Sequence, residues 1–118
     1  MTLDEFFAGY KGSRAIFDAL HTAIAALGAV EMRVTKSQVA FRRRRAFAWA
    51  WTPQRYLCGA HAPLVLSLAF SKRDDSTRWK EIVEPKPGRW MHHLELYSPV
   101  AIDDQVQRWL REAWEAAS

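Results

Sequence analysis

Hydrophobic residues recur at three- to four-residue spacing in two stretches of the chain, and this spacing predicts two amphipathic helices. The first would begin at Ser13 and end at Leu27, because Gly28 favours the backbone conformation that terminates helices. The second would follow Asp103, whose short carboxylate suits an N-cap. The apolar faces of the two helices consist of Ile16, Phe17, Leu20, Ile24 and Leu27, and of Val106, Trp109, Leu110, Ala113 and Trp114.

Between these helices, apolar and polar residues alternate with a period of two, which is typical of half-buried β-strands. The segment Glu84-Pro-Lys-Pro-Gly88 separates two such stretches and favours a turn between antiparallel strands. From the alternating stretches we expect a sheet of about five strands. The stretches are 30–34, 39–43, 45–51, 64–70, 79–83 and 89–97.

The order helix, strands, helix within 118 residues predicts a single domain over residues 1–118. A helix with one apolar face must bury that face against another element. We therefore predict an α+β fold, a two-layer sandwich of an antiparallel sheet with the N- and C-terminal helices packed on one face.

The alternation also predicts which strand residues face the helices. Counted strictly, it places Phe47, Trp49 and Trp51 in the core and leaves alanines on the opposite face of the same strand, at positions Ala46, Ala48 and Ala50. Small side chains on an outer face permit close approach by a ligand or by a second copy of the chain. A register error of one residue would exchange the two faces and put the alanines under a helix.

Charge modifies this picture because it is clustered. The chain carries a formal net charge of +4 and has a sequence pI near 9.6. Arg42, Arg43, Arg44 and Arg45 are contiguous, and Lys36 lies close by in the sequence. Such a patch next to aromatic residues is compatible with an anionic small molecule or nucleic acid, held through phosphates and stacked bases. The alternative is a solvated hairpin whose aromatic rings belong to the core, and the strict alternation favours it.

The segment Met91-His-His-Leu-Glu95 is the main candidate for chemistry. His93 and Glu95 share one face of a strand, so they could act as an acid–base pair or contribute two metal ligands. Two ligands do not make a metal site, and no nucleophile or phosphate-binding motif accompanies them. We therefore predict no metal, no cofactor and no catalytic residue.

The remaining composition narrows the class of protein. A single cysteine, Cys58, fits a reducing compartment, and the acidic N-terminus does not resemble a signal peptide. No apolar run approaches the length of a membrane span. We expect a cytoplasmic protein with no membrane association.

Several segments together resemble a known family. They are Thr35-Lys-Ser-Gln-Val-Ala-Phe-Arg-Arg-Arg-Arg45, Phe47-Ala-Trp49, Arg89-Trp-Met-His-His-Leu-Glu-Leu96 and Trp109-Leu-Arg-Glu-Ala113. These segments resemble the bacterial domain-of-unknown-function family 5655, and the resemblance extends over nearly the whole chain. It implies a compact α+β domain of this length and supplies no established activity, cofactor or catalytic residue. Some members are fused to restriction-type or nuclease-like proteins, which favours nucleic acid as a partner by analogy.

The sequence therefore predicts a non-enzymatic binding or interaction module for an anionic ligand or nucleic acid. Its expected binding residues are Lys36, Arg43, Arg45, His93 and Glu95, arranged around the alanine-lined face. Two alternatives remain at this point. One is a small enzyme that uses His93 and Glu95 as acid and base, and the other is a structural homodimer through the alanine-lined face.

Overall fold

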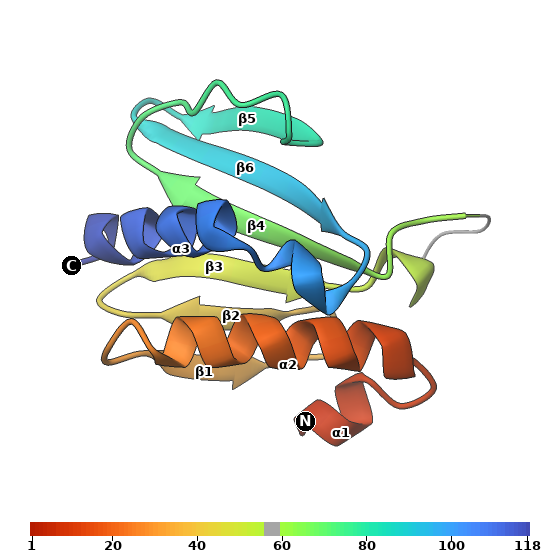
Figure 1. The fold of residues 1–118 in the computed structure, drawn as a ribbon. Coiled ribbons are helices and arrows are strands. Elements are labelled where there is room, and N and C mark those ends of the chain that lie inside the picture. Colours follow the sequence, from red (N-terminus) through yellow and green to blue (C-terminus); the bar gives the residue numbers. More distant parts are fainter. Residues whose placement is uncertain (56–59) are drawn as a thin grey trace.

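The computed structural model describes residues 1–55 and 60–118 and consists of a sheet covered on one face by helices (Figure 1). The sheet is antiparallel, and its six strands lie in the order β1-β2-β3-β4-β6-β5. The predicted α+β class is confirmed, with six strands instead of about five. Cys58, on which the expected compartment rested, lies outside the described residues. The strands are β1 (Glu31–Val34), β2 (Val39–Arg42), β3 (Ala46–Trp51), β4 (Leu64–Phe70), β5 (Glu81–Lys86) and β6 (Arg89–Leu96).

The helical layer contains the two predicted helices and a short N-terminal one. These are α1 (Leu3–Phe6), α2 (Lys11–Ala25) and α3 (Asp104–Ala116), with short 3-10 turns at Pro53–Arg55 and Pro99–Ala101. Asp103 caps α3 as predicted, because its side chain accepts a hydrogen bond from the backbone of Val106. Ser13 does not cap α2. It lies inside the helix, where its hydroxyl donates to the carbonyl of Pro63 at 2.6 Å.

The core lies between the helices and the sheet. It joins the apolar stripes of α2 and α3 to alternate residues of β4 and β6. The strand β4 is buried along its whole length, as expected for the central strand that contacts both helices. From these strands the core takes Leu64, Leu66, Leu68, Phe70, Leu94 and Leu96.

A β-bulge at the start of β3 overturns the predicted assignment of its faces. Phe41 pairs with Ala48, while the next residue, Arg42, pairs with Ala46, so Phe47 is an extra residue in the strand. Phe47 and Ala48 consequently both face the core, where they are 1% and 0% exposed. Because a single inserted residue reverses the parity of everything after it, Ala50 also lies in the core.

The prediction of an alanine-lined outer face is therefore wrong. Ala48 and Ala50 lie beneath the helices, where their small side chains let the helical layer approach the sheet closely. Trp49 and Trp51, expected in the core, occupy the opposite, outer face and are partly exposed. A homodimer through a surface made of Ala46, Ala48 and Ala50 has no such surface to use.

His92, a core residue next to the candidate His93, is fully buried. Its ring contacts Phe70 and Trp79, with centroids 4.6 and 4.9 Å away. The backbone N–H of Asp74 donates to Nε2 at 2.9 Å, and Nδ1 lies 3.3 Å from the carbonyl of Trp90. These contacts fit the neutral ring that carries its proton on Nδ1.

We expect His92 to make the fold sensitive to acid. Burial lowers the pKa of His92 below its ordinary value of 6.5, because the charged ring is costly in the core and would lose the bond from Asp74. Below about pH 6.5, His92 then binds a proton in the unfolded chain but not in the folded one. The free energy of unfolding therefore falls as the pH falls, by at most about 1.4 kcal/mol per pH unit. Urea unfolding between pH 7.5 and 5 measures this slope.

One variant tests the assignment to His92. His92→Gln removes the titrating group and keeps an acceptor for Asp74, so the slope between pH 7.5 and 5 should flatten. An unchanged slope in His92→Gln would contradict the assignment.

Candidate functional site

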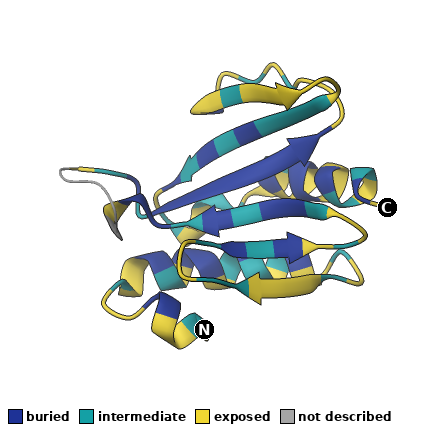
Figure 2. Ribbon diagram, turned by 180° about the vertical axis from the view of Figure 1, so that it is seen from behind, coloured by how far each residue is buried: buried dark blue, intermediate teal, exposed yellow. Residues whose placement is uncertain are grey.

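The outer face of the sheet carries no helix from the described part of the chain (Figure 2). Directly paired residues in antiparallel strands point to the same side, so the register defines a row of side chains that crosses the whole outer face. From one edge of the sheet to the other, this row is Arg33, Ala40, Trp49, Ser67, His93 and Glu81. Aromatic, hydroxyl, imidazole and charged groups thus share one accessible surface.

A furrow follows the central strand β4 on this face. Its outward residues Val65, Ser67 and Ala69 are only 7%, 5% and 8% exposed. Because no helix covers them, the larger side chains of the neighbouring strands must provide this burial. A hollow of about 480 Å³ lies over the furrow, and its lining comprises Ser37, Gln38, Trp49, Trp51, Ser67, Met91 and His93.

His93 pairs with a serine rather than with its predicted acid partner. The hydroxyl of Ser67 and Nδ1 of His93 are 2.7 Å apart, which fixes the orientation of the imidazole in the hollow. The carboxylate of Glu95 instead lies 4.0 Å from Nζ of Lys80, a contact too long to be a strong ion pair. The described residues include no hydrogen bond between His93 and Glu95. The predicted acid–base pair is therefore not brought together.

The Ser67–His93 contact does not by itself form a nucleophilic centre. Ser67 lies in the middle of β4, between Trp49 of β3 and His93 of β6, so the backbone amides around it serve the two ladders. An acyl-transfer site needs free amides to stabilise an oxyanion. Within residues 1–55 and 60–118, no cluster of three or more metal-ligating side chains is found. The hollow thus presents a hydroxyl and an imidazole that are hydrogen bonded to each other.

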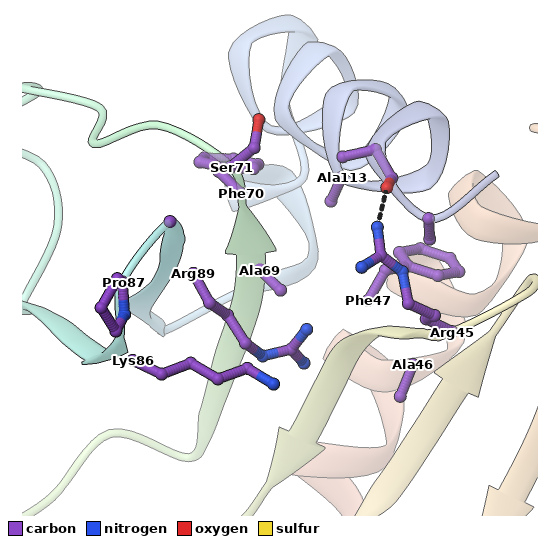
Figure 3. A pocket seen from close by; sticks show the side chains of 13 residues that line it. Arg45, Ala46, Phe47, Ala69, Phe70, Ser71, Lys86, Pro87, Arg89 and Ala113 are labelled. Atoms are coloured by element: carbon purple, nitrogen blue, oxygen red, sulfur yellow. Dashed lines mark hydrogen bonds between the residues drawn. The ribbon is translucent and has the colours of Figure 1, made fainter.

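A second cavity opens where β3 and β4 separate. Their ladder ends at Ala48 and Leu68, and a cavity of about 270 Å³ lies beyond this pair, between the two strand ends. The C-terminal part of α3 contributes Ala113, Ala116 and Ala117 to its lining. Figure 3 shows the side chains of Arg45, Lys86 and Arg89 reaching toward this space.

Arg89 connects the two hollows. It lines the cavity between β3 and β4, and its guanidinium lies 5.8 Å from the ring centroid of Trp49, within the range of a cation–π contact. Trp49 in turn lines the hollow that contains Ser67 and His93. The cavity and the hollow are thus parts of one surface. We call this surface the indole face and define it by Trp49, Trp51, Ser67, Met91, His93 and Arg89.

The predicted arginine patch acts mainly on the end of α3. Arg43 donates to the carbonyl of Trp114 at 3.1 Å, and its guanidinium lies 3.5 Å from the centroid of the Trp114 ring. Arg45 donates to the carbonyl of Ala116 at 2.7 Å. The backbone N–H of Arg44 donates to the carbonyl of Ala117 at 3.1 Å. The turn between β2 and β3 therefore supplies the hydrogen bonds that the last carbonyls of a helix lack.

The five predicted binding residues do not converge on one point. Lys36 lies in the turn between β1 and β2, at the end of the sheet opposite to Arg43 and Arg45. His93 and Glu95 share the outer face with the indoles, His93 in the hollow and Glu95 toward Lys80. Of the five, His93 and Arg45 line the hollows just described.

Sequence reasoning missed four residues of the hollow and the cavity. Trp49 and Trp51 are predicted in the core because the bulge at Phe47 leaves no clear mark in the pattern. Lys86 lies inside the segment predicted as a turn, but β5 extends to Lys86, which pairs with Arg89 across a tighter turn.

An antiparallel sheet with two helices behind it and an open aromatic face defines a small α+β domain built around a sheet surface. The chain belongs to the family described as domain of unknown function DUF5655, whose model matches residues 3–117. The resemblance seen in the sequence is thereby confirmed. No curated protein and no solved structure matches the chain. Among the described residues, no helix is both long and apolar enough to cross a membrane.

We predict that two adjacent arginines of the run differ in their effect on stability. Arg43→Ala removes a hydrogen bond and a stacked cation from Trp114, so it should lower the free energy of unfolding by roughly 1–2 kcal/mol. Arg44→Ala keeps the backbone bond to Ala117 and removes an exposed side chain, so it should change stability by less than about 0.5 kcal/mol. Chemical denaturation of both variants measures the difference, and equal losses would contradict the assigned role of Arg43.

Proposed function

We propose that this domain is a cytoplasmic, non-enzymatic module that binds single-stranded nucleic acid on its indole face. The observation that carries the proposal is the placement of Trp49 and Trp51 on an open sheet surface with Arg89 beside them. Aromatic rings on such a surface stack with unpaired bases, and neighbouring cations hold the phosphates.

The distribution of charge supports the same function. At the end of the sheet where β3 and β6 begin, the hairpin turns bring together Arg45, Lys86 and Arg89. Arg45 comes from the run that the sequence singled out, and the other two come from the second hairpin. The other end of the face is mixed in sign, with Glu95 near Lys80. A strand with its phosphates at the basic end would lay its bases toward the indoles.

The shape of the face supports a strand better than a duplex. The furrow over β4 is lined by flat and small side chains on a twisted sheet, and the described part of the chain offers no exposed helix there to enter a major groove. Stacking tolerates every base because every base has a π-face, so we expect weak dependence on sequence. The hydroxyl of Ser67, the imidazole of His93 and the amide of Gln38 could add hydrogen bonds to base edges.

The enzymatic alternative gains no support from the geometry, because among the described residues His93 contacts Ser67 and Glu95 lies near Lys80 instead. A homodimer would have to use the indole face itself, since Ala48 and Ala50 are buried. The binding experiment distinguishes these occupants of the face.

The proposal predicts that a fluorescent single-stranded oligonucleotide binds and that removal of the rings weakens binding. Loss of one stacking ring costs roughly 1–3 kcal/mol, so Trp49→Leu should raise the dissociation constant about 5- to 150-fold, and Trp51→Leu should act similarly. Trp49→Phe keeps a ring and should retain most of the affinity. Fluorescence anisotropy, with circular dichroism as a check of folding, measures this series.

Salt dependence provides the second readout. If the protein neutralises about three phosphates, a plot of the logarithm of the association constant against the logarithm of the salt concentration should have a slope near −2. Arg111→Gln, which removes a charge from α3 on the opposite layer, should leave affinity and slope nearly unchanged. The proposal would be contradicted if Trp49→Leu bound the oligonucleotide as tightly as the parent protein does. It would also be contradicted if sedimentation showed a stable dimer that binds no oligonucleotide.

A further inference from the structure

The cavity between the diverging ends of β3 and β4 is lined by positive charge. Its described lining residues include three cations, Arg45, Lys86 and Arg89, and no carboxylate. The acid nearest to the turn of the same hairpin, Glu84, accepts a hydrogen bond from the backbone of Gly88 and does not line the cavity. Convergent cations repel one another unless an anion lies between them, so this arrangement favours a bound anion.

The three cations have different roles. The C-terminus of α3, which carries a partial negative charge, borders the cavity and would by itself repel an anion. Arg45 donates to the carbonyl of Ala116, and Arg43 donates to that of Trp114, so these two arginines offset the helix end. Among the described residues, neither Lys86 nor Arg89 forms an ion pair with a carboxylate, and both side chains reach toward the cavity.

The shape of the cavity limits what can enter it. Phe47, Ala113 and Ala117 close its inner side, and they belong to the buried core (Figure 3). A continuous strand cannot pass through such a floor, so the group that enters must be the end of a chain or a small molecule. The volume of about 270 Å³ is far above the roughly 10–15 Å³ that one water requires, so the cavity has room for a group of several heavy atoms.

We propose that this cavity binds a phosphate monoester, the terminal phosphate of the single strand that the indole face holds. A terminal phosphate carries a second charge and an additional free oxygen compared with the diesters inside a strand, so it suits the fork of Arg89 and the ammonium of Lys86 better. Arg45 acts as a positioning residue that offsets the helix end. This inference rests on the proposed function, because Arg89 also lies over Trp49 and so joins the phosphate to the bases.

The test compares oligonucleotides of one sequence that differ only at their ends. One carries a 5′-phosphate, one carries a 3′-phosphate and one carries hydroxyls at both ends. The dissociation constant of each for the intact protein is measured by fluorescence anisotropy. We expect one phosphorylated end to bind about tenfold more tightly than the unphosphorylated oligonucleotide, as befits one or two charged hydrogen bonds. Inorganic phosphate at millimolar concentration should abolish the difference by competing for the cavity.

Variants assign the preference to the cavity. Lys86→Gln should bring the phosphorylated and unphosphorylated oligonucleotides to equal affinity, and the readout is this ratio, because Lys86 also adds positive charge for the phosphates inside a strand. Arg89→Lys keeps the charge but loses the fork, so it should reduce the preference. Trp49→Leu should weaken all oligonucleotides together. Arg111→Gln, with the same loss of charge as Lys86→Gln, should retain the preference.

The outcomes separate this inference from the proposed function. Equal affinity for phosphorylated and unphosphorylated oligonucleotides would overturn the terminal-phosphate site and leave nucleic-acid binding intact. A preference that survives in Lys86→Gln would overturn the assignment to this cavity. If no oligonucleotide binds but ribose 5-phosphate binds in a manner that depends on Lys86, the phosphate site stands and the proposed function falls. If neither binds, both are overturned.

Discussion

The bulge at Phe47 is the constraint on which the arrangement of this domain depends. One extra residue lets Phe47 and Ala48 enter the core together and sends Trp49 and Trp51 to the opposite side. The core gains from this exchange, because alanines under α2 and α3 allow the helices to lie close to β3. The same extra residue places the two large rings of Trp49 and Trp51 on a surface that none of the described helices covers.

The turn that precedes the bulge couples this strand to the last helix. Arg43 and Arg45 bind carbonyls at the end of α3, and the ring of Trp114 lies between Arg43 and the backbone near Gly28. A Cβ atom on Gly28 would lie 2.8 Å from that ring, so glycine is required there for packing as well as for its φ of 143°. Four consecutive like charges are therefore tolerated because two of them meet a helix terminus, whose partial negative charge answers them.

Periodicity in the sequence was sufficient for the order of the elements and for the layers, but not for every boundary, since α2 ends at Ala25 and β5 extends to Lys86. The stripes of α2 and α3 and the cap at Asp103 depend on local patterns, and the structure has them where the sequence predicts them. The faces of β3 were not predictable in this way, because a bulge of one residue depends on how β2 pairs with it and not on either strand alone. The convergence of Lys86 and Arg89 with Arg45 is likewise a property of strand order, which places residues more than 40 positions apart at one end of the sheet.

The partly exposed tryptophans of the outer face lower the stability that the fold could gain from them. Tryptophan side chains bury a large apolar area when they are covered, and exposing them forgoes that stabilisation. Here the small outward residues of β4 that pair with these tryptophans are nearly inaccessible, although none of the described helices covers them. The remaining exposed faces, with Arg89 beside Trp49, are not needed to complete the core. A flat partner that stacks on these rings would remove their exposed apolar area from water. This gain is the physical reason to expect a stacking partner on the indole face.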